Sequence, residues 1–95
     1  VGGRAFRVDA GGFWQIHRLA AATLTETVTQ ALRRSGAFDP DALHLDLYGG
    51  VGLFAAAIGD LGGARTRTIS VESDARATAH ATENLAAWPT MRAET

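Results

Sequence analysis

Residues 44–54, HLDLYGGVGLF, predict a strand, a glycine turn and the start of a helix, and the other predicted elements are placed relative to them. The alternating leucines of residues 43–47 predict a short buried strand, and the three glycines within residues 49–52 predict a sharp turn. Because glycine has no Cβ, such a turn lets a ligand approach the backbone closely. Residues 55–58, three alanines and an isoleucine, are apolar and predict a helix that can pack closely on a sheet. Open α/β sheets bind nucleotides at strand–turn–helix units of this kind.

The rest of the chain alternates strands with helices around this unit. The expected strands are residues 4–9, 42–47, 65–71 and 91–95, and the expected helices are residues 16–35, 50–61 and a last helix that ends before Pro89. Gly36 is expected to end the long helix, and Ser73 or Asp74 to cap the last one. Ile69 and Val71 are expected to face the core. The alternation predicts an α/β fold with a mainly parallel sheet and right-handed crossovers.

Length and composition narrow the possibilities further. Ninety-five residues make one small domain at most, and a full doubly wound sheet normally needs more, so a truncated domain is expected. The net charge of −1 gives no basic field for nucleic acid, and the absence of cysteine excludes disulfides, thiolate metal sites and a cysteine nucleophile within these residues. We find no apolar run of membrane-spanning length and no signal peptide, so a cytoplasmic protein is expected.

The glycine turn differs from the known phosphate-binding motifs. Its pattern, Asp46 followed by Gly50 and Gly52, is not GxGxxG and lacks the Lys-Ser/Thr of a P-loop. An acidic side chain at the end of the strand suits an ammonium group, a hydroxyl group or ordered water better than a phosphate. The alternative is a tight packing turn without a ligand, and the motif alone leaves both interpretations open.

Glu72 is the second candidate, at the end of the next predicted strand. A carboxylate at this position can accept two hydrogen bonds from a ribose diol, as in dinucleotide-binding folds. The alternative is a solvated glutamate at a strand end. The glycine turn and the strand-end acid together favour a nucleoside ligand with no phosphate at the turn, and S-adenosylmethionine fits that description.

Residues 46–54, DLYGGVGLF, resemble the first cofactor motif of the RNA 5-methyluridine methyltransferases. These enzymes use S-adenosylmethionine to methylate uracil in tRNA or rRNA. Residues 12–15, GFWQ, resemble the family's aromatic-x-Gln segment, which also precedes a long helix, and Val71, Glu72 and Asn84 fall at the expected positions. The resemblance covers nearly the whole chain and implies the first part of a Rossmann-like class I methyltransferase core.

The resemblance also implies S-adenosylmethionine as the cofactor and the residues that bind it, which are Gln15, Asp46, Tyr48, Gly50, Gly52 and Glu72. Gln15 would contact its amino-acid end, Tyr48 would pack beside it, and Glu72 would bind the ribose hydroxyls. Asp46 would support the turn or the methionine amino group, and Phe13 would lie near the target base. The alternatives are that Phe13 is a core aromatic and that Gln15 only caps a helix.

Two positions depart from the family pattern, because Gly49 stands where the family usually has Cys and His17 where it often has Asn. The family attacks uracil C6 with a cysteine thiolate, which this chain lacks, so no catalytic residue is assigned and these residues alone are expected to be inactive. In this interpretation, residues 1–40 form a strand and a long helix, and residues 41–88 form the cofactor-binding unit.

The parent protein is then expected to methylate uracil C5 in tRNA or rRNA, with RNA as its partner. Three alternatives stay open: a class I methyltransferase with another substrate, a non-catalytic cofactor-binding remnant, and a structural fragment whose turn binds nothing. His17, His44 and His80 lack metal-ligand spacing, so a structural or surface role is predicted for them and no metal is expected.

Overall fold

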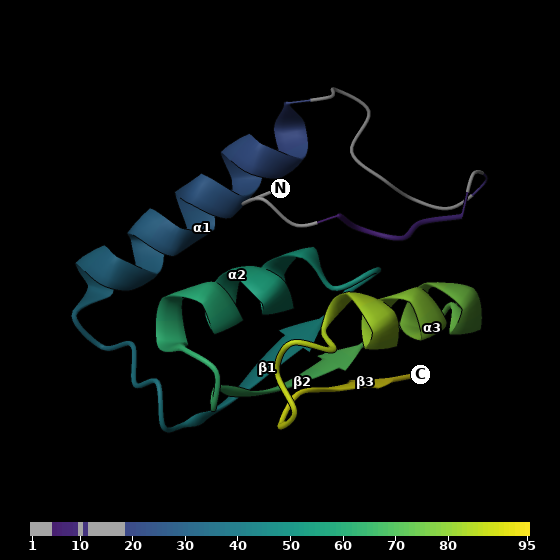
Figure 1. Ribbon diagram of the computed structural model, residues 1–95. Coiled ribbons are helices and arrows are strands. Elements are labelled where there is room, and N and C mark those ends of the chain that lie inside the picture. Colours follow the sequence, from purple (N-terminus) through teal and green to yellow (C-terminus); the bar gives the residue numbers. More distant parts are fainter. Residues whose placement is uncertain (1–4, 10, 12–18) are drawn as a thin grey trace.

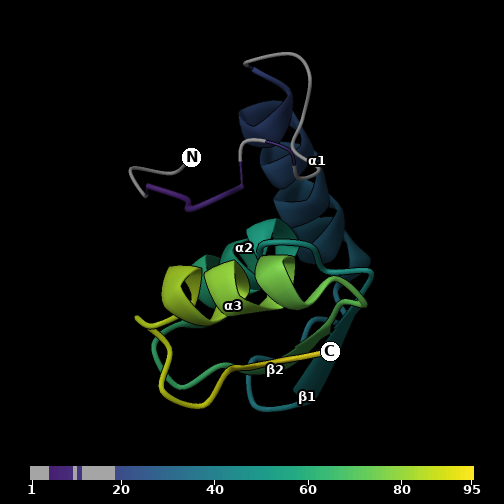
Figure 2. The same ribbon diagram turned by 90° about the vertical axis from the view of Figure 1, so that its right-hand side faces the viewer.

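The chain folds into alternating helices and strands in the computed structural model, which describes residues 5–9, 11 and 19–95 (Figure 1). The elements are α1 (Ala20–Ser35), β1 (Leu43–Leu47), α2 (Leu53–Gly62), β2 (Arg67–Val71), α3 (Ala75–Asn84) and β3 (Arg92–Glu94). The strands form one parallel sheet in the order β1-β2-β3. Helices α2 and α3 lie on the same face of this sheet, and α1 packs against α2 (Figures 1 and 2). The predicted α/β fold with a parallel sheet is confirmed.

Local sequence sets the ends of the helices. Gly36 ends α1 with a left-handed φ of 65°, and Asp74 caps α3 by accepting a hydrogen bond of 3.0 Å from the Arg76 N–H group, both as predicted. Helix α2 begins at Leu53, three residues later than predicted. Gly50 and Gly52 have φ values of 57° and 95°, which no α-helix accommodates, so they belong to the turn.

The strand predicted at residues 4–9 is wrong for the residues that the structure describes, because residues 5–9 form no strand. Residue 4 and residues 16–18 of the predicted long helix lie outside the described part of the chain. The backbone of Arg7 forms its hydrogen bonds with the side chain of Asn84 rather than with a neighbouring strand. Alternating polarity therefore predicted an extended segment without predicting its hydrogen-bonding partner.

The sheet buries the face opposite to the one that the sequence predicts. The three leucines of β1 are 52–62% exposed, and Ile69 and Val71 are only half-buried. Thr68 and Ser70 are instead buried almost completely on β2. Right-handed crossovers place α2 and α3 on one side of a parallel sheet, and they cover the side that carries the small polar residues. Among the described residues, no helix covers the side that carries the leucines (Figure 2).

The hydrophobic core lies between the sheet and the helices α2 and α3. It consists of Ala55, Ala56, Leu85, Trp88 and Met91, with Phe6 packed against it from the N-terminal segment. No helix in the described part of the chain is both long enough and apolar enough to cross a membrane.

Candidate functional site

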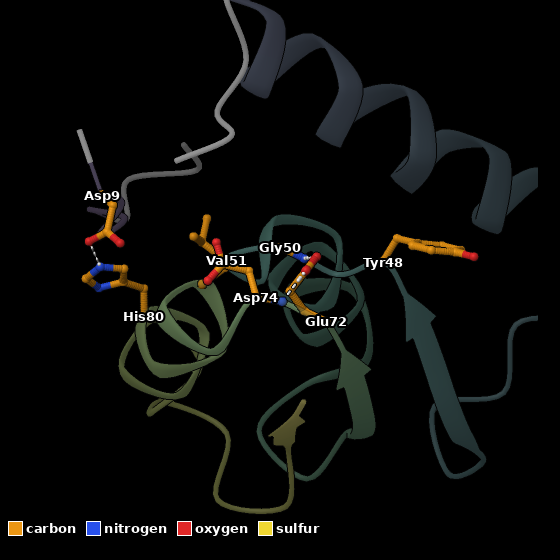
Figure 3. Close-up of a pocket in the computed structure, with 8 residues that line it drawn as sticks. Asp9, Tyr48, Gly50, Val51, Glu72, Asp74 and His80 are labelled. Carbon is orange, nitrogen blue, oxygen red and sulfur yellow. Dashed lines mark hydrogen bonds and ion pairs between the residues drawn. The ribbon is translucent and has the colours of Figure 1, made fainter. Parts of the chain in front are cut away.

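A cavity of about 360 Å³ opens at the carboxyl ends of β1 and β2 (Figure 3). Residues from the N-terminal segment, the glycine turn, the end of β2 and α3 line it: Asp9, Tyr48, Gly50, Val51, Glu72, Asp74, Ala77 and His80. Asp9 and His80 lie at one end, Tyr48 lies at the other, and Gly50 and Glu72 lie between them. The structure therefore brings three of the predicted cofactor residues, Tyr48, Gly50 and Glu72, to one cavity.

The glycine turn is held by the backbone of the sheet. The Gly49 N–H group donates to the Val71 carbonyl at 2.9 Å, which continues the ladder between β1 and β2. Tyr48 has a positive φ of 58° and is 93% exposed, so its ring is accessible to a ligand. Gly52 does not line the cavity; a Cβ at this position would lie 3.2 Å from the Leu85 side chain. Gly52 therefore allows Leu85 to pack closely behind the turn.

Glu72 links the glycine turn to the turn that follows β2. Its Oε1 atom accepts a hydrogen bond of 3.1 Å from the Gly50 N–H group, and its Oε2 atom accepts one of 2.8 Å from the Asp74 N–H group. The Ser73 hydroxyl donates to Oε2 at 3.4 Å. These bonds, above all the one from Asp74, lower the pKa of Glu72. The carboxylate is therefore ionised at neutral pH and fixed in orientation.

Asp46 lies beneath the turn and outside the lining of the cavity. Its side chain is buried, the Ala55 amide donates to it, and burial raises its pKa. Its Oδ2 atom and the Ser70 hydroxyl, on the neighbouring strand in register, have no hydrogen-bond partner within the described part of the chain. A Cβ at Gly49 would overlap the Ser70 hydroxyl and lie 3.2 Å from Asp46 Oδ2. The serine at position 70 thus explains the glycine at position 49, where the family usually has Cys.

A side-chain contact that the sequence did not predict lies at one end of the cavity. His80 Nε2 and Asp9 Oδ1 lie 2.7 Å apart, and Arg76 Nε lies 3.4 Å from Asp9 Oδ2. The hydrogen bond with His80 lowers the pKa of Asp9. Because these two residues are 71 positions apart, no sequence motif joins them. The predicted sites Phe13 and Gln15 lie outside the described residues.

The lining of the cavity suits hydroxyl and cationic groups. Three carboxylates, from Asp9, Glu72 and Asp74, face it together with the single imidazole of His80. Ionised carboxylates only accept hydrogen bonds, so they favour donors and disfavour phosphates. Within residues 5–9, 11 and 19–95, no group of three or more His, Asp or Glu side chains is placed to hold a metal ion.

No family model matches the chain. Among curated proteins, an uncharacterized RNA methyltransferase of Streptomyces avermitilis is 46% identical over 93 residues, which are 97% of this chain and 20% of the relative. An uncharacterized RNA methyltransferase of Bifidobacterium longum is 40% identical over 82 residues, which are 86% of this chain and 19% of the relative. The chain thus spans about a fifth of the length of these relatives. The resemblance to RNA methyltransferases predicted from the sequence is confirmed.

Two solved structures share the fold. The Pyrococcus abyssi tRNA (uracil-54, C5)-methyltransferase in complex with S-adenosyl-L-homocysteine superposes with a TM-score of 0.67 at 19% identity, over 95% of this chain and 20% of that one. Pyrococcus horikoshii TYW2 in complex with MeSAdo superposes with a TM-score of 0.66 at 18% identity, over 98% of this chain and 33% of that one. At these identities the likeness establishes the fold alone, and it confirms the predicted Rossmann-like α/β fold.

Proposed function

We propose that this chain is the cofactor-binding part of an S-adenosylmethionine-dependent RNA methyltransferase. One observation carries the proposal: the Gly50 amide and the Glu72 carboxylate are joined at 3.1 Å in a cavity at the carboxyl ends of adjacent parallel strands. The relatives named RNA methyltransferases and the fold shared with a complex of S-adenosyl-L-homocysteine support it. In this proposal residues 41–88 form the cofactor-binding unit, and the extended segment of residues 5–9 and the helix α1 complete it.

The carboxylates that line the cavity suit this cofactor, which carries hydroxyl and cationic groups but no phosphate, and which supplies an electrophilic methyl group when bound. Glu72 accepts hydrogen bonds from the ribose hydroxyls, and its two backbone partners hold it in place before the cofactor arrives. Tyr48 offers an exposed aromatic ring beside the cofactor. Asp46 and Gly52 support the turn from beneath without lining the cavity. Asp46 accepts a hydrogen bond from the Ala55 amide, and Gly52 leaves room for the Leu85 side chain to pack against the turn.

The parts of the site outside the described residues belong to the same proposal. Gln15 contacts the amino-acid end of the cofactor, and Phe13 lies near the target base, as the resemblance of residues 12–15 implies. We infer that the whole protein methylates uracil C5 in tRNA or rRNA, in the cytoplasm and as a step of RNA processing. The thiolate that this chemistry needs must come from outside these 95 residues, because they contain no cysteine.

A methyltransferase with another substrate is the second candidate, because TYW2 shares the fold at nearly the same TM-score as the uracil enzyme. A chimera distinguishes the two. In the Streptomyces avermitilis relative, the matching 93 residues are replaced by this chain, and RNA is incubated with isotope-labelled S-adenosylmethionine. We expect 5-methyluridine in the nucleoside digest. Another methylated nucleoside would support the second candidate, and an inactive chimera beside an active parent would contradict both.

Cofactor binding is tested on the chain itself by calorimetry with S-adenosyl-L-homocysteine. We expect Glu72→Gln to weaken binding at least tenfold, because a hydrogen bond to a charged group contributes about 1.5–3 kcal/mol. Glu94→Gln is the matched control: it removes an exposed carboxylate of β3 that does not line the cavity. Equal affinity of the wild type and Glu72→Gln would refute the ribose contact.

A further inference from the structure

The side chain of Asn84, the last residue of α3, joins two segments that are distant in sequence. Its Oδ1 atom accepts a hydrogen bond of 2.8 Å from the Arg7 N–H group. Its Nδ2 atom donates to the Arg7 carbonyl at 3.1 Å and to the Val51 carbonyl at 2.9 Å. The two bonds to Arg7 imitate the exchange of N–H and C=O bonds between paired strands, which requires a side chain with both a donor and an acceptor.

The two segments held by Asn84 form walls of the same cavity. Val51 lies in the glycine turn and lines the cavity directly. Arg7 lies two residues before Asp9, which lines the cavity at the end opposite to Tyr48. Asn84 itself does not line the cavity, so it can influence a ligand only through these neighbours.

Side-chain contacts also fasten the N-terminal segment to α3, among them the half-buried contact of Asp9 with His80 and the exposed ion pair of Arg7 with Glu83. Arg7 Nε lies 2.8 Å from Glu83 Oε2, and these side chains are 74% and 57% exposed. Ion pairs at such exposure contribute little because water screens them. The Asn84 bond to Val51 is partly buried, and a buried carbonyl that loses its donor is costly. Asn84 is therefore better placed than Glu83 to fix the separation of the two walls.

We propose that Asn84 is a positioning residue for the nucleoside cofactor. It holds the N-terminal segment and the glycine turn at the separation that the cofactor requires. This inference rests on the proposed function and adds to it a residue that touches neither the cofactor nor the cavity. Preorganised walls lower the cost of ordering the site on binding, so the loss of Asn84 raises the dissociation constant.

The first test is Asn84→Asp, which preserves the size of the side chain and the acceptor for the Arg7 N–H group. It replaces the donor to Arg7 and Val51 with a carboxylate oxygen that faces their carbonyls. We expect the dissociation constant for S-adenosyl-L-homocysteine to rise at least fivefold, while the far-ultraviolet circular dichroism is retained. The control variant Glu83→Gln is expected to change the dissociation constant less than twofold. A lower unfolding midpoint with unchanged affinity would overturn the proposal, because it would show a purely structural role.

A second pair of variants does not alter Asn84 and covers the case in which Asn84→Asp fails to fold. Arg7→Pro removes the N–H group that donates to Asn84, whereas Arg7→Ala removes only the side chain and its ion pair. We expect Arg7→Pro to weaken binding at least threefold and Arg7→Ala to leave it within twofold. Equal effects of the two substitutions would overturn the proposal.

Hydrogen exchange separates this inference from the proposed function, because it needs no ligand. We expect Asn84→Asp to speed amide exchange at least threefold both at residues 7–9 and at residues 50–52. Faster exchange at one wall or at neither would overturn the positioning role. A wild-type chain that does not bind S-adenosyl-L-homocysteine would refute the proposed function and the cofactor role of Asn84, and the exchange data would still decide whether Asn84 couples the two walls.

Discussion

The two faces of the sheet differ in a way that inverts the usual distribution of polarity. On the covered face, Thr68 and Ser70 are 0% and 1% exposed, whereas on the open face Leu45 is 62% exposed. The covering helix α2 presents alanines that are 0–3% exposed, so small residues meet on both sides of this contact. Handedness of the crossovers decides which face receives the helices, and small side chains then let α2 approach closely. Burial in this sheet therefore follows topology rather than hydropathy.

The open face has the composition of a surface that parallel sheets normally cover. Its three leucines, Leu43, Leu45 and Leu47, lie side by side along β1, and hollows of about 320 and 370 Å³ flank them. Parallel sheets are usually buried on both faces, and near-continuous apolar strands are typical of them. The leucine pattern of β1 is thus typical of a buried strand, but the leucines are exposed.

The largest effect on stability is expected when a leucine of the core and a leucine of the open face are each replaced by alanine. Leu85 lies in the core and is 3% exposed. Replacing it with alanine should lower the unfolding free energy by about 2–5 kcal/mol. Leu45→Ala should change that free energy by no more than about 0.5 kcal/mol, because the side chain is already in water. Urea unfolding of the two variants at low protein concentration measures both. A cost for Leu45→Ala close to that for Leu85→Ala would show that the open face is covered in solution.

The next effect concerns the crowded end of the covered face. Gly49→Cys restores the residue usual in the family, but its Cβ would overlap the Ser70 hydroxyl. We therefore expect this substitution to lower the unfolding free energy by about 1–3 kcal/mol. The same substitution in a Ser70→Gly background should cost less than about 0.5 kcal/mol, because the obstructing hydroxyl is gone. Urea unfolding of the wild type, the two single variants and the double variant measures the coupling energy between positions 49 and 70. Equal costs in both backgrounds would show that Ser70 does not dictate Gly49.

The finest test of the covered face varies pH. Burial raises the pKa of Asp46 above the usual 3.8, so the folded chain binds this proton more tightly than the unfolded chain does. The contribution of Asp46 to stability therefore falls as pH rises above 3.8 and levels off beyond the raised pKa. The unfolding free energy of the wild type relative to Asp46→Asn should decline over that window. A relative stability that rises with pH would contradict the burial of this carboxylate.

Features that depend on neighbouring residues were predictable from the sequence. Gly36 and Asp74 end and begin their helices because a left-handed turn and a side-chain cap are local requirements, and the glycine turn follows β1 for the same reason. The buried face was not predictable, since strand alternation is symmetric between the two sides of a sheet. The contacts of Asp9 with His80 and of Arg7 with Asn84 depend on how distant segments meet, and no spacing in the sequence reports that.

We propose that the carboxyl ends of β1 and β2, and not the open apolar face, form the binding site for a nucleoside cofactor. The most direct test titrates the ¹⁵N-labelled chain with S-adenosyl-L-homocysteine and follows the backbone amide resonances. We expect saturable shifts at Gly50, Val51 and Glu72 and no shifts at Leu43 and Leu45. Unshifted resonances at the glycine turn, or shifts concentrated on the leucines of β1, would contradict the claim.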